Sequence, residues 1–196
     1  MQLFTKEELK DILIAVLTVT LIFSYNADNP VNTVNVFPFY ILTTVIVFLF
    51  HELAHRFVAR KFGCLATFKL WPQGVLFGLL FMLIGIRFVA VGAIQVLPFA
   101  FGRWGYRIVE LTAEEMGLIA TSGIGVNIFF AIIFKPLAGT LMWQGIDVFG
   151  SLAFVNSWLA LINLLPLPPL DGSKIIAWKP LIWFILFLAA ILLVFL

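Results

Sequence analysis

The feature of this sequence that most restricts its fold is a long uncharged stretch that ends in an HExxH motif. No charged residue lies between Asp28 and Glu52, and His51, Glu52 and His55 form the motif. A stretch this long and apolar is typical of a membrane-spanning helix. Residues four apart share one face of a helix, so both imidazoles can reach one metal ion. Glu52 projects about 100° away from His51, where it can contact a water on that metal.

The alternative interpretation of the motif is a chance match, with two histidines packed in a helical core. Such matches are common in soluble helices. At the centre of a bilayer, however, an ionised side chain costs about 2.5–3.5 kcal/mol, so it is rarely present without a function. His51 and His55 are also the only histidines of the chain. We therefore predict a metal site.

The composition points to the same environment. Hydrophobic residues make up 63% of the 196 positions and charged residues 11%, which leaves too few polar side chains to cover a soluble domain. We predict an integral helical membrane protein that lies in a lipid bilayer. A net charge of +2 gives no indication of nucleic-acid binding, and we expect none. Because Cys64 is the single cysteine, an internal disulfide and a cysteine-based zinc site are excluded.

The apolar segments predict about five full membrane spans. Their approximate bounds are 12–24, 36–62, 116–134, 148–165 and 178–196, with turns outside the membrane over 26–35 and 135–147. The first span lacks a small-residue cleavage site, so we interpret it as a retained anchor. Arg56, Arg60 and Lys61 end the second span, and a basic cluster of this kind marks the cytoplasmic side. We interpret these side chains as interfacial anchors only, and we expect the N-terminus and the HExxH side to be cytoplasmic.

The segment between the second and third spans is predicted to enter the membrane and to return on the same side. Residues 67–71 have the character of a short strand, 74–86 are apolar, and 88–97 are rich in β-branched residues. A complete crossing here would place the later acidic motif on the wrong side of the membrane. We therefore expect an all-α polytopic membrane protein with one re-entrant, β-containing element, either a helical hairpin or a β-ribbon, buried against protein or lining a cavity.

The third span has a defined start and an unusual polar residue. Thr112 and Glu115 have the spacing of a capping box, which places the helix start near Thr112. Within the span, Gly123 and other small residues allow another helix to approach closely. Packing explains Asn127 in mid-membrane less well, so Asn127 is a candidate substrate-binding residue.

A catalytic zinc has three protein ligands and one open position, so the two histidines need a partner. Most carboxylates of the chain lie in polar flanking segments. Asp171 instead follows a span that is broken by Pro166, Pro168 and Pro169, where the chain unwinds at membrane depth. An interfacial turn at Asp171 and Gly172 is the alternative. We predict that Asp171 completes a site for one zinc ion per chain.

These residues are suited to hydrolysis. Zinc held in this way lowers the pKa of its water towards about 7, and Glu52 is placed to take the proton and pass it to a leaving amine. The side-chain amide of Asn163 could stabilise the oxyanion. A hydrogen bond from Asn163 to another helix is an equal alternative. We predict Glu52 and Asn163 as catalytic residues.

Three sequence elements together resemble the site-2 protease family of intramembrane zinc metalloproteases. They are the HExxH of residues 51–55, a GxxxN element from Gly123 to Asn127, and Asn163-x-x-Pro166 followed by Leu170-Asp171-Gly172. The resemblance covers residues 36–172 and is to a compact archaeal or bacterial type of member. It implies that both histidines and Asp171 bind zinc, that Glu52 is the base, and that the substrate is a transmembrane segment of another protein, cut near the cytosolic face.

The resemblance also implies regulated intramembrane proteolysis. As a departure from the family pattern, we expect a single membrane-embedded domain over residues 1–196, with no PDZ or other soluble domain. A zinc-binding or transport protein and a degenerate, non-catalytic member are the alternatives, and Glu52 beside the metal favours the enzyme. A prenyl-protein-type membrane zincin shares HExxH, but the Leu-Asp-Gly ending favours the site-2 protease. Because a helical substrate hides its peptide bonds, we hypothesise that residues 88–97 hold an unwound substrate by β-addition.

Overall fold

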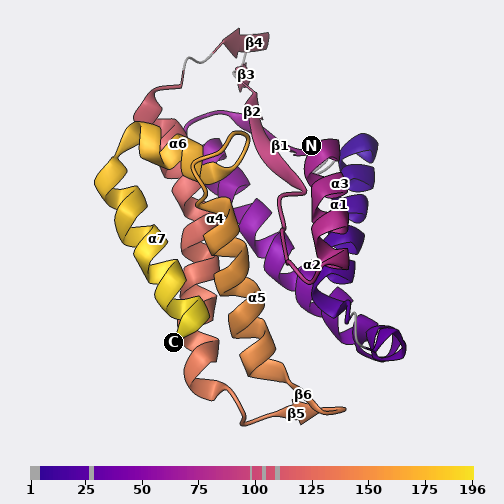
Figure 1. Cartoon of the computed structure of the whole chain (residues 1–196). Helices are drawn as coiled ribbons and strands as arrows, with labels where there is room; N and C mark the ends of the chain where they lie inside the picture. The colour runs from indigo at the N-terminus through magenta and orange to yellow at the C-terminus, as the bar shows by residue number, and fades with distance from the viewer. Residues whose placement is uncertain (1–4, 27–28, 98, 103–104, 109–110) are drawn as a thin grey trace.

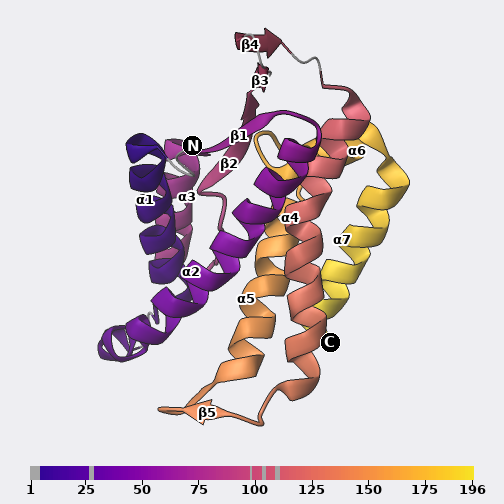
Figure 2. The same ribbon diagram turned by 180° about the vertical axis from the view of Figure 1, so that it is seen from behind.

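A long helix, α2 (Pro30–Lys61), lies between two groups of elements. The computed structural model describes residues 5–26, 29–97, 99–102, 105–108 and 111–196. Figures 1 and 2 show α1 (Lys6–Ser24) and α3 (Pro72–Leu83) on one side of α2. The opposite side of α2 holds α4 (Ala113–Phe134), α5 (Val148–Asn163) and α7 (Pro180–Phe195). Helix α2 therefore contacts both halves of the molecule.

The start of α2 differs from the expectation. We expected a turn over 26–35, but the helix begins at Pro30. The Asn29 side chain caps it by accepting from the Asn32 N–H, and proline suits the first helical position because its missing N–H would have no partner there. The HExxH motif consequently lies in the second half of a single long helix.

Residues 71–91 leave the β1–β2 end of the molecule and return to it, because the two strands that flank this segment pair with each other. Strands β1 (Leu65–Leu70) and β2 (Gly92–Leu97) pair antiparallel, and the Trp71 N–H donates to the Val91 carbonyl at 2.8 Å. Helix α3 leads away from this ribbon, and the chain returns without regular structure. The structure thus combines the helix and the β-ribbon that the sequence offered as alternatives. Its position in a bilayer stays a prediction.

The remaining elements cap the two ends of the molecule. The hairpin of β3 (Phe99–Gly102) and β4 (Gly105–Ile108) lies at the same end as β1 and β2, whereas β5 (Met142–Trp143) and β6 (Ile146–Asp147) lie at the opposite end, near the 3-10 turn η1 (Lys135–Leu137). The predicted capping box of Thr112 and Glu115 is confirmed at the start of α4. The last predicted span, 178–196, is shorter, because Lys179 separates α6 (Asp171–Trp178) from α7.

Two helical stretches of the described chain, Val31–Lys61 and Ala113–Leu137, are long and apolar enough to cross a membrane. The apolar helices α3, α5 and α7 are shorter, so five full crossings are not confirmed. Large apolar side chains are nevertheless exposed on the outer faces of α2, α4 and α7, such as Phe57, Phe129 and Phe184. Exposed apolar side chains in this number are unusual on a soluble monomer and suit contact with lipid.

Candidate metal centre

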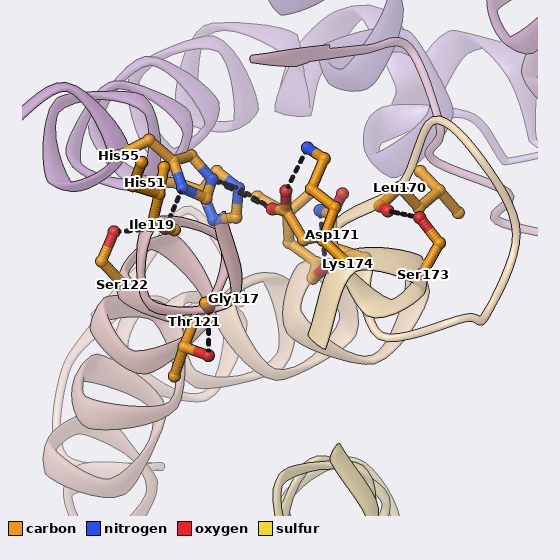
Figure 3. Close-up of polar contacts among 12 residues, drawn as sticks. His51, His55, Gly117, Ile119, Thr121, Ser122, Leu170, Asp171, Ser173 and Lys174 are labelled. Carbon is orange, nitrogen blue, oxygen red and sulfur yellow. Dashed lines mark hydrogen bonds and ion pairs between the residues drawn. The ribbon is translucent and has the colours of Figure 1, made fainter. Parts of the chain in front are cut away.

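Three side chains that the sequence selected as metal ligands meet in the interior. His51 and His55 project from one face of α2, and Asp171 projects from the first turn of α6 (Figure 3). The two Nε2 atoms lie 3.0 Å apart. Asp171 Oδ2 lies 3.5 Å from His51 Nε2 and 3.0 Å from His55 Nε2. All three residues are at most 4% exposed.

These separations fit a zinc ion. Bonds of about 2.0–2.2 Å from zinc to nitrogen or oxygen place the corners of a tetrahedron about 3.3 Å apart. The three observed separations, 3.0, 3.0 and 3.5 Å, lie around that value. Cys64 does not belong to the group, and burial raises the pKa of its thiol, so it offers no thiolate. The described residues therefore supply one imidazole–imidazole–carboxylate set.

A neighbouring carbonyl determines which nitrogen of the His55 ring donates a hydrogen bond. His55 Nδ1 lies 2.7 Å from the carbonyl oxygen of Ile119 in α4. Because a carbonyl only accepts, Nδ1 must donate, and in the neutral imidazole Nε2 then carries the lone pair that a metal needs. Figure 3 shows this contact on the side of the ring opposite Asp171.

Helix α4 approaches the histidines closely because residue 123 has no side chain. A Cβ atom at Gly123 would lie 2.4 Å from His55 Nε2 and 2.8 Å from His51 Cε1. At Gly125, one half-turn away, a Cβ would meet nothing within 4 Å. We predicted that small residues of this span let another helix approach closely. At Gly123 the missing side chain leaves room for both imidazoles of α2.

Glu52 lies beside this group in a small cavity of about 20 Å³, which is enough for about one water molecule. The cavity is lined by the three ligand residues and Glu52, together with residues of β2 and α5 that include Ile94 and Asn163. Glu52 is 4% exposed, and its Oε2 has no hydrogen-bond partner among the residues that the structure describes. A buried carboxylate oxygen without a partner, facing a water-sized space, is suited to accept a proton from water.

The two asparagines differ in their relation to the cavity. Asn163 lines it, and its Nδ2 donates to the Leu159 carbonyl of its own helix at 2.9 Å, so the alternative of a bond to another helix is not observed. Asn127 is fully buried and does not line the cavity, and within the described part of the chain neither polar atom of its side chain has a hydrogen-bond partner. A role for Asn127 in substrate binding stays a prediction.

The interpretation of Arg56 as an interfacial anchor is wrong. Its side chain is buried and forms an ion pair with buried Glu8 of α1. Glu8 Oε1 also accepts from the Phe68 N–H of β1 at 2.7 Å, and Asp11 accepts from the Leu70 N–H at 3.2 Å. No periodicity or motif in the sequence links α1 to β1, which explains why this network was missed.

The fold and the site define a mostly helical protein whose HExxH helix and a distant aspartate form a zinc-type ligand set. A protein of Methanocaldococcus jannaschii named "Putative zinc metalloprotease MJ0611" is 37% identical over an alignment of 188 positions, which covers 92% of this chain and 88% of the relative. "Putative zinc metalloprotease YwhC" of Bacillus subtilis is 33% identical over 71% of this chain and 68% of its own length. "Putative zinc metalloprotease Rip2" of Mycolicibacterium smegmatis is 26% identical over 74% and 58%, respectively.

No family model and no solved structure matches the chain. The chain belongs to the site-2 protease-like family of zinc metalloproteases. It is accordingly a metalloprotease, and its cofactor is zinc.

Proposed function

We propose that this protein hydrolyses a peptide bond within or near a transmembrane segment of another membrane protein, close to the cytosolic face. The observation that carries the proposal is the position of the cavity. It is buried against α2, a helix that is apolar enough to cross a membrane, and it holds the ligand set together with the unpartnered Glu52 carboxylate. The basic residues Arg60 and Lys61, exposed at the end of this helix, support a multi-pass chain with a cytoplasmic active-site end and N-terminus.

Five polar residues that line the cavity have a chemical role in this proposal. His51, His55 and Asp171 hold zinc, which supplies Lewis-acid activation of water and of the substrate carbonyl. Glu52 accepts the proton of the attacking water and returns it to the leaving amine. The second amide hydrogen of Asn163 donates to the developing oxyanion, since the first is held by Leu159.

The test is cleavage of a transmembrane peptide in lipid vesicles by the purified protein. We expect Glu52→Gln to lower the rate about 10²–10⁴-fold, because the base is lost, while about one zinc per chain is retained. Asp171→Ala should lower the zinc content itself. A parent protein that binds zinc but cleaves no transmembrane peptide, or a Glu52→Gln variant that cleaves normally, would favour a zinc-binding or transport role instead.

The ribbon of β1 and β2 supports a way to hold an unwound substrate. The outer edge of β1 is occupied, because Glu8 and Asp11 accept from its Phe68 and Leu70 N–H groups. The opposite edge belongs to β2, whose Gly92 and Ile94 line the metal cavity. An extended substrate segment can therefore add to β2 beside Glu52.

The register shows which residue tests this addition. Val91 accepts from the Trp71 N–H and so faces β1, and alternation then turns the backbone N–H of Ile94 to the open edge. We expect Ile94→Pro to reduce cleavage while zinc stays bound, because proline removes the N–H that would pair with the substrate. Ile94→Ala is the matched control for the lost side chain. Equal cleavage by the two variants would refute β-addition at this edge.

A further inference from the structure

The two oxygens of the Asp171 carboxylate have different partners. Oδ2 faces the two histidine Nε2 atoms, at 3.0 and 3.5 Å. Oδ1 faces the opposite way and accepts from Lys174 Nζ at 3.0 Å. Figure 3 shows the ammonium and the imidazoles on different sides of the carboxylate.

We propose that Lys174 is a positioning residue, which holds Asp171 Oδ1 so that the carboxylate presents the single oxygen Oδ2 to the metal. The proposal rests on the ligand set of the proposed function. A charge-assisted hydrogen bond of this kind is among the stronger polar contacts, and it fixes the rotation of the carboxylate plane. Groups that orient a metal ligand in this way commonly change metal affinity 10–100-fold.

The backbone of α6 and its packing bring Lys174 close to Asp171. Asp171 and Lys174 are three residues apart in α6, so their side chains lie on one face of the helix. Ile175 is fully buried and anchors α6 to the core formed by α4 and α5. A Cβ at Gly172 would lie 2.2 Å from the Leu164 carbonyl, which shows how closely the start of α6 packs on the end of α5. The position of Lys174 relative to Asp171 is therefore set before any metal binds.

The consequence concerns the open coordination position. A carboxylate that turned both oxygens to the ion would occupy the place that a catalytic zinc keeps for water. By engaging Oδ1, Lys174 keeps that place free. Its positive charge also offsets the second carboxylate, Glu52, which shares the same small cavity.

Lys174 can be replaced without opening the core. Its side chain is 21% exposed and also lines an outer groove of about 300 Å³ beside Lys69 and Pro169. We compare Lys174→Met, which keeps the length and removes the charge, with Lys174→Arg, which restores a donor. Lys179→Met removes a lysine of the same segment whose Nζ lies over the Trp178 ring, and it serves as the matched control.

The measurements are competition for zinc with a chelator and the visible absorption spectrum after Co²⁺ replaces zinc. We expect Lys174→Met to bind zinc about 10–100-fold more weakly, and Lys174→Arg and Lys179→Met to bind as the parent does. The visible Co²⁺ spectrum of Lys174→Met should differ from that of the parent, because the second carboxylate oxygen takes the position that water occupies in the parent.

The two readouts separate positioning from a general loss of charge. An unchanged Co²⁺ spectrum in Lys174→Met overturns the proposal, even with weaker zinc binding, because a lost charge alone explains weaker binding. Unchanged zinc affinity overturns it as well. Asp171→Ala is the reference: if that variant binds zinc normally, the ligand set of the proposed function is wrong. If it loses zinc while Lys174→Met behaves as the parent, the ligand set stands and only the role of Lys174 fails.

Discussion

Helix α2 carries two buried polar clusters within one turn of each other, and they are built in opposite ways. The metal cluster consists of His51, His55 and Asp171, and the clamp consists of the Glu8 carboxylate, the Arg56 guanidinium and the Phe68 N–H. In the clamp, each contact joins a donor to an acceptor. In the metal cluster, three atoms that can each bind a metal converge: His51 Nε2, His55 Nε2 and Asp171 Oδ2 lie 3.0–3.5 Å from one another.

The difference shows which property of a buried cluster indicates a function. Burial and charge are common to both clusters, so neither property distinguishes them. The groups of the clamp attract one another without any added group, because Arg56 and Glu8 carry opposite charges and the Phe68 N–H donates to Glu8. A cation placed between these ligand atoms would attract all three, and among the described residues Glu52 Oε2 beside them has no hydrogen-bond partner. The metal cluster therefore offers a ligand set to an ion, which the clamp does not.

The largest effect is expected from breaking the clamp. Arg56→Ala leaves the buried Glu8 carboxylate without its counter-charge, which costs about 3–5 kcal/mol of folding free energy. Denaturant titration in detergent micelles measures this loss. Arg60→Ala, at an exposed position one turn later in α2, should change the stability by less than about 1 kcal/mol.

A double variant then separates the clamp from the metal cluster. Glu8→Gln with Arg56→Met removes both charges and keeps an oxygen that can accept from the Phe68 N–H. We expect this protein to recover most of the lost stability and to bind about one zinc per chain, because neutral replacements of a buried ion pair are often tolerated. If the double variant folds but no longer binds zinc, the two clusters are coupled and the comparison is wrong.

An intermediate effect is expected at the metal cluster from a substitution that keeps all three ligand residues but shifts their side chains. Gly123→Ala puts a methyl group 2.4 Å from His55 Nε2, so the imidazoles must move and zinc should bind about 10–100-fold more weakly. Gly125→Ala in the same helix meets no neighbour, and it should leave zinc binding unchanged. Chelator competition on the two variants measures the difference. Equal zinc affinities would show that α4 does not limit the position of the histidines.

The comparison also explains what the sequence could predict. The ligand residues carry local signals: two histidines four apart in an apolar helix, and an aspartate after a proline-broken span. The structure brings these three side chains together. The return of residues 71–91 was inferred from the need to place Asp171 on the HExxH side. The metal ligands could be predicted because they depend on helix periodicity, whereas the number of crossings stays a prediction.

The clamp has no comparable signal. Glu8 lies among several charged residues at the chain start, and Arg56 lies in a basic cluster that an interfacial role already explains. Their contact depends on how α1 packs against α2 and β1, which no short-range pattern determines. The start of α2 was missed for a different reason, because Asn29 and Pro30 suit a turn and a capped helix equally well. The predicted bounds of the last span failed where Lys179 separates α6 from α7.

The smallest effect is expected at an exposed polar cluster. Its loss of stability is a reference for the two buried clusters. At the start of α4, the Thr112 hydroxyl accepts from the Glu115 N–H at 3.2 Å, and the Glu115 carboxylate accepts from the Thr112 N–H at 2.8 Å. Thr112→Ala should cost about 1 kcal/mol of folding free energy, and Thr112→Ser should cost almost nothing, because serine retains the capping oxygen. Denaturant titration should show both variants with unchanged zinc content. Thr112→Ala should therefore lose much less folding free energy than Arg56→Ala. Equal losses would mean that burial does not set the cost of breaking a polar cluster in this protein.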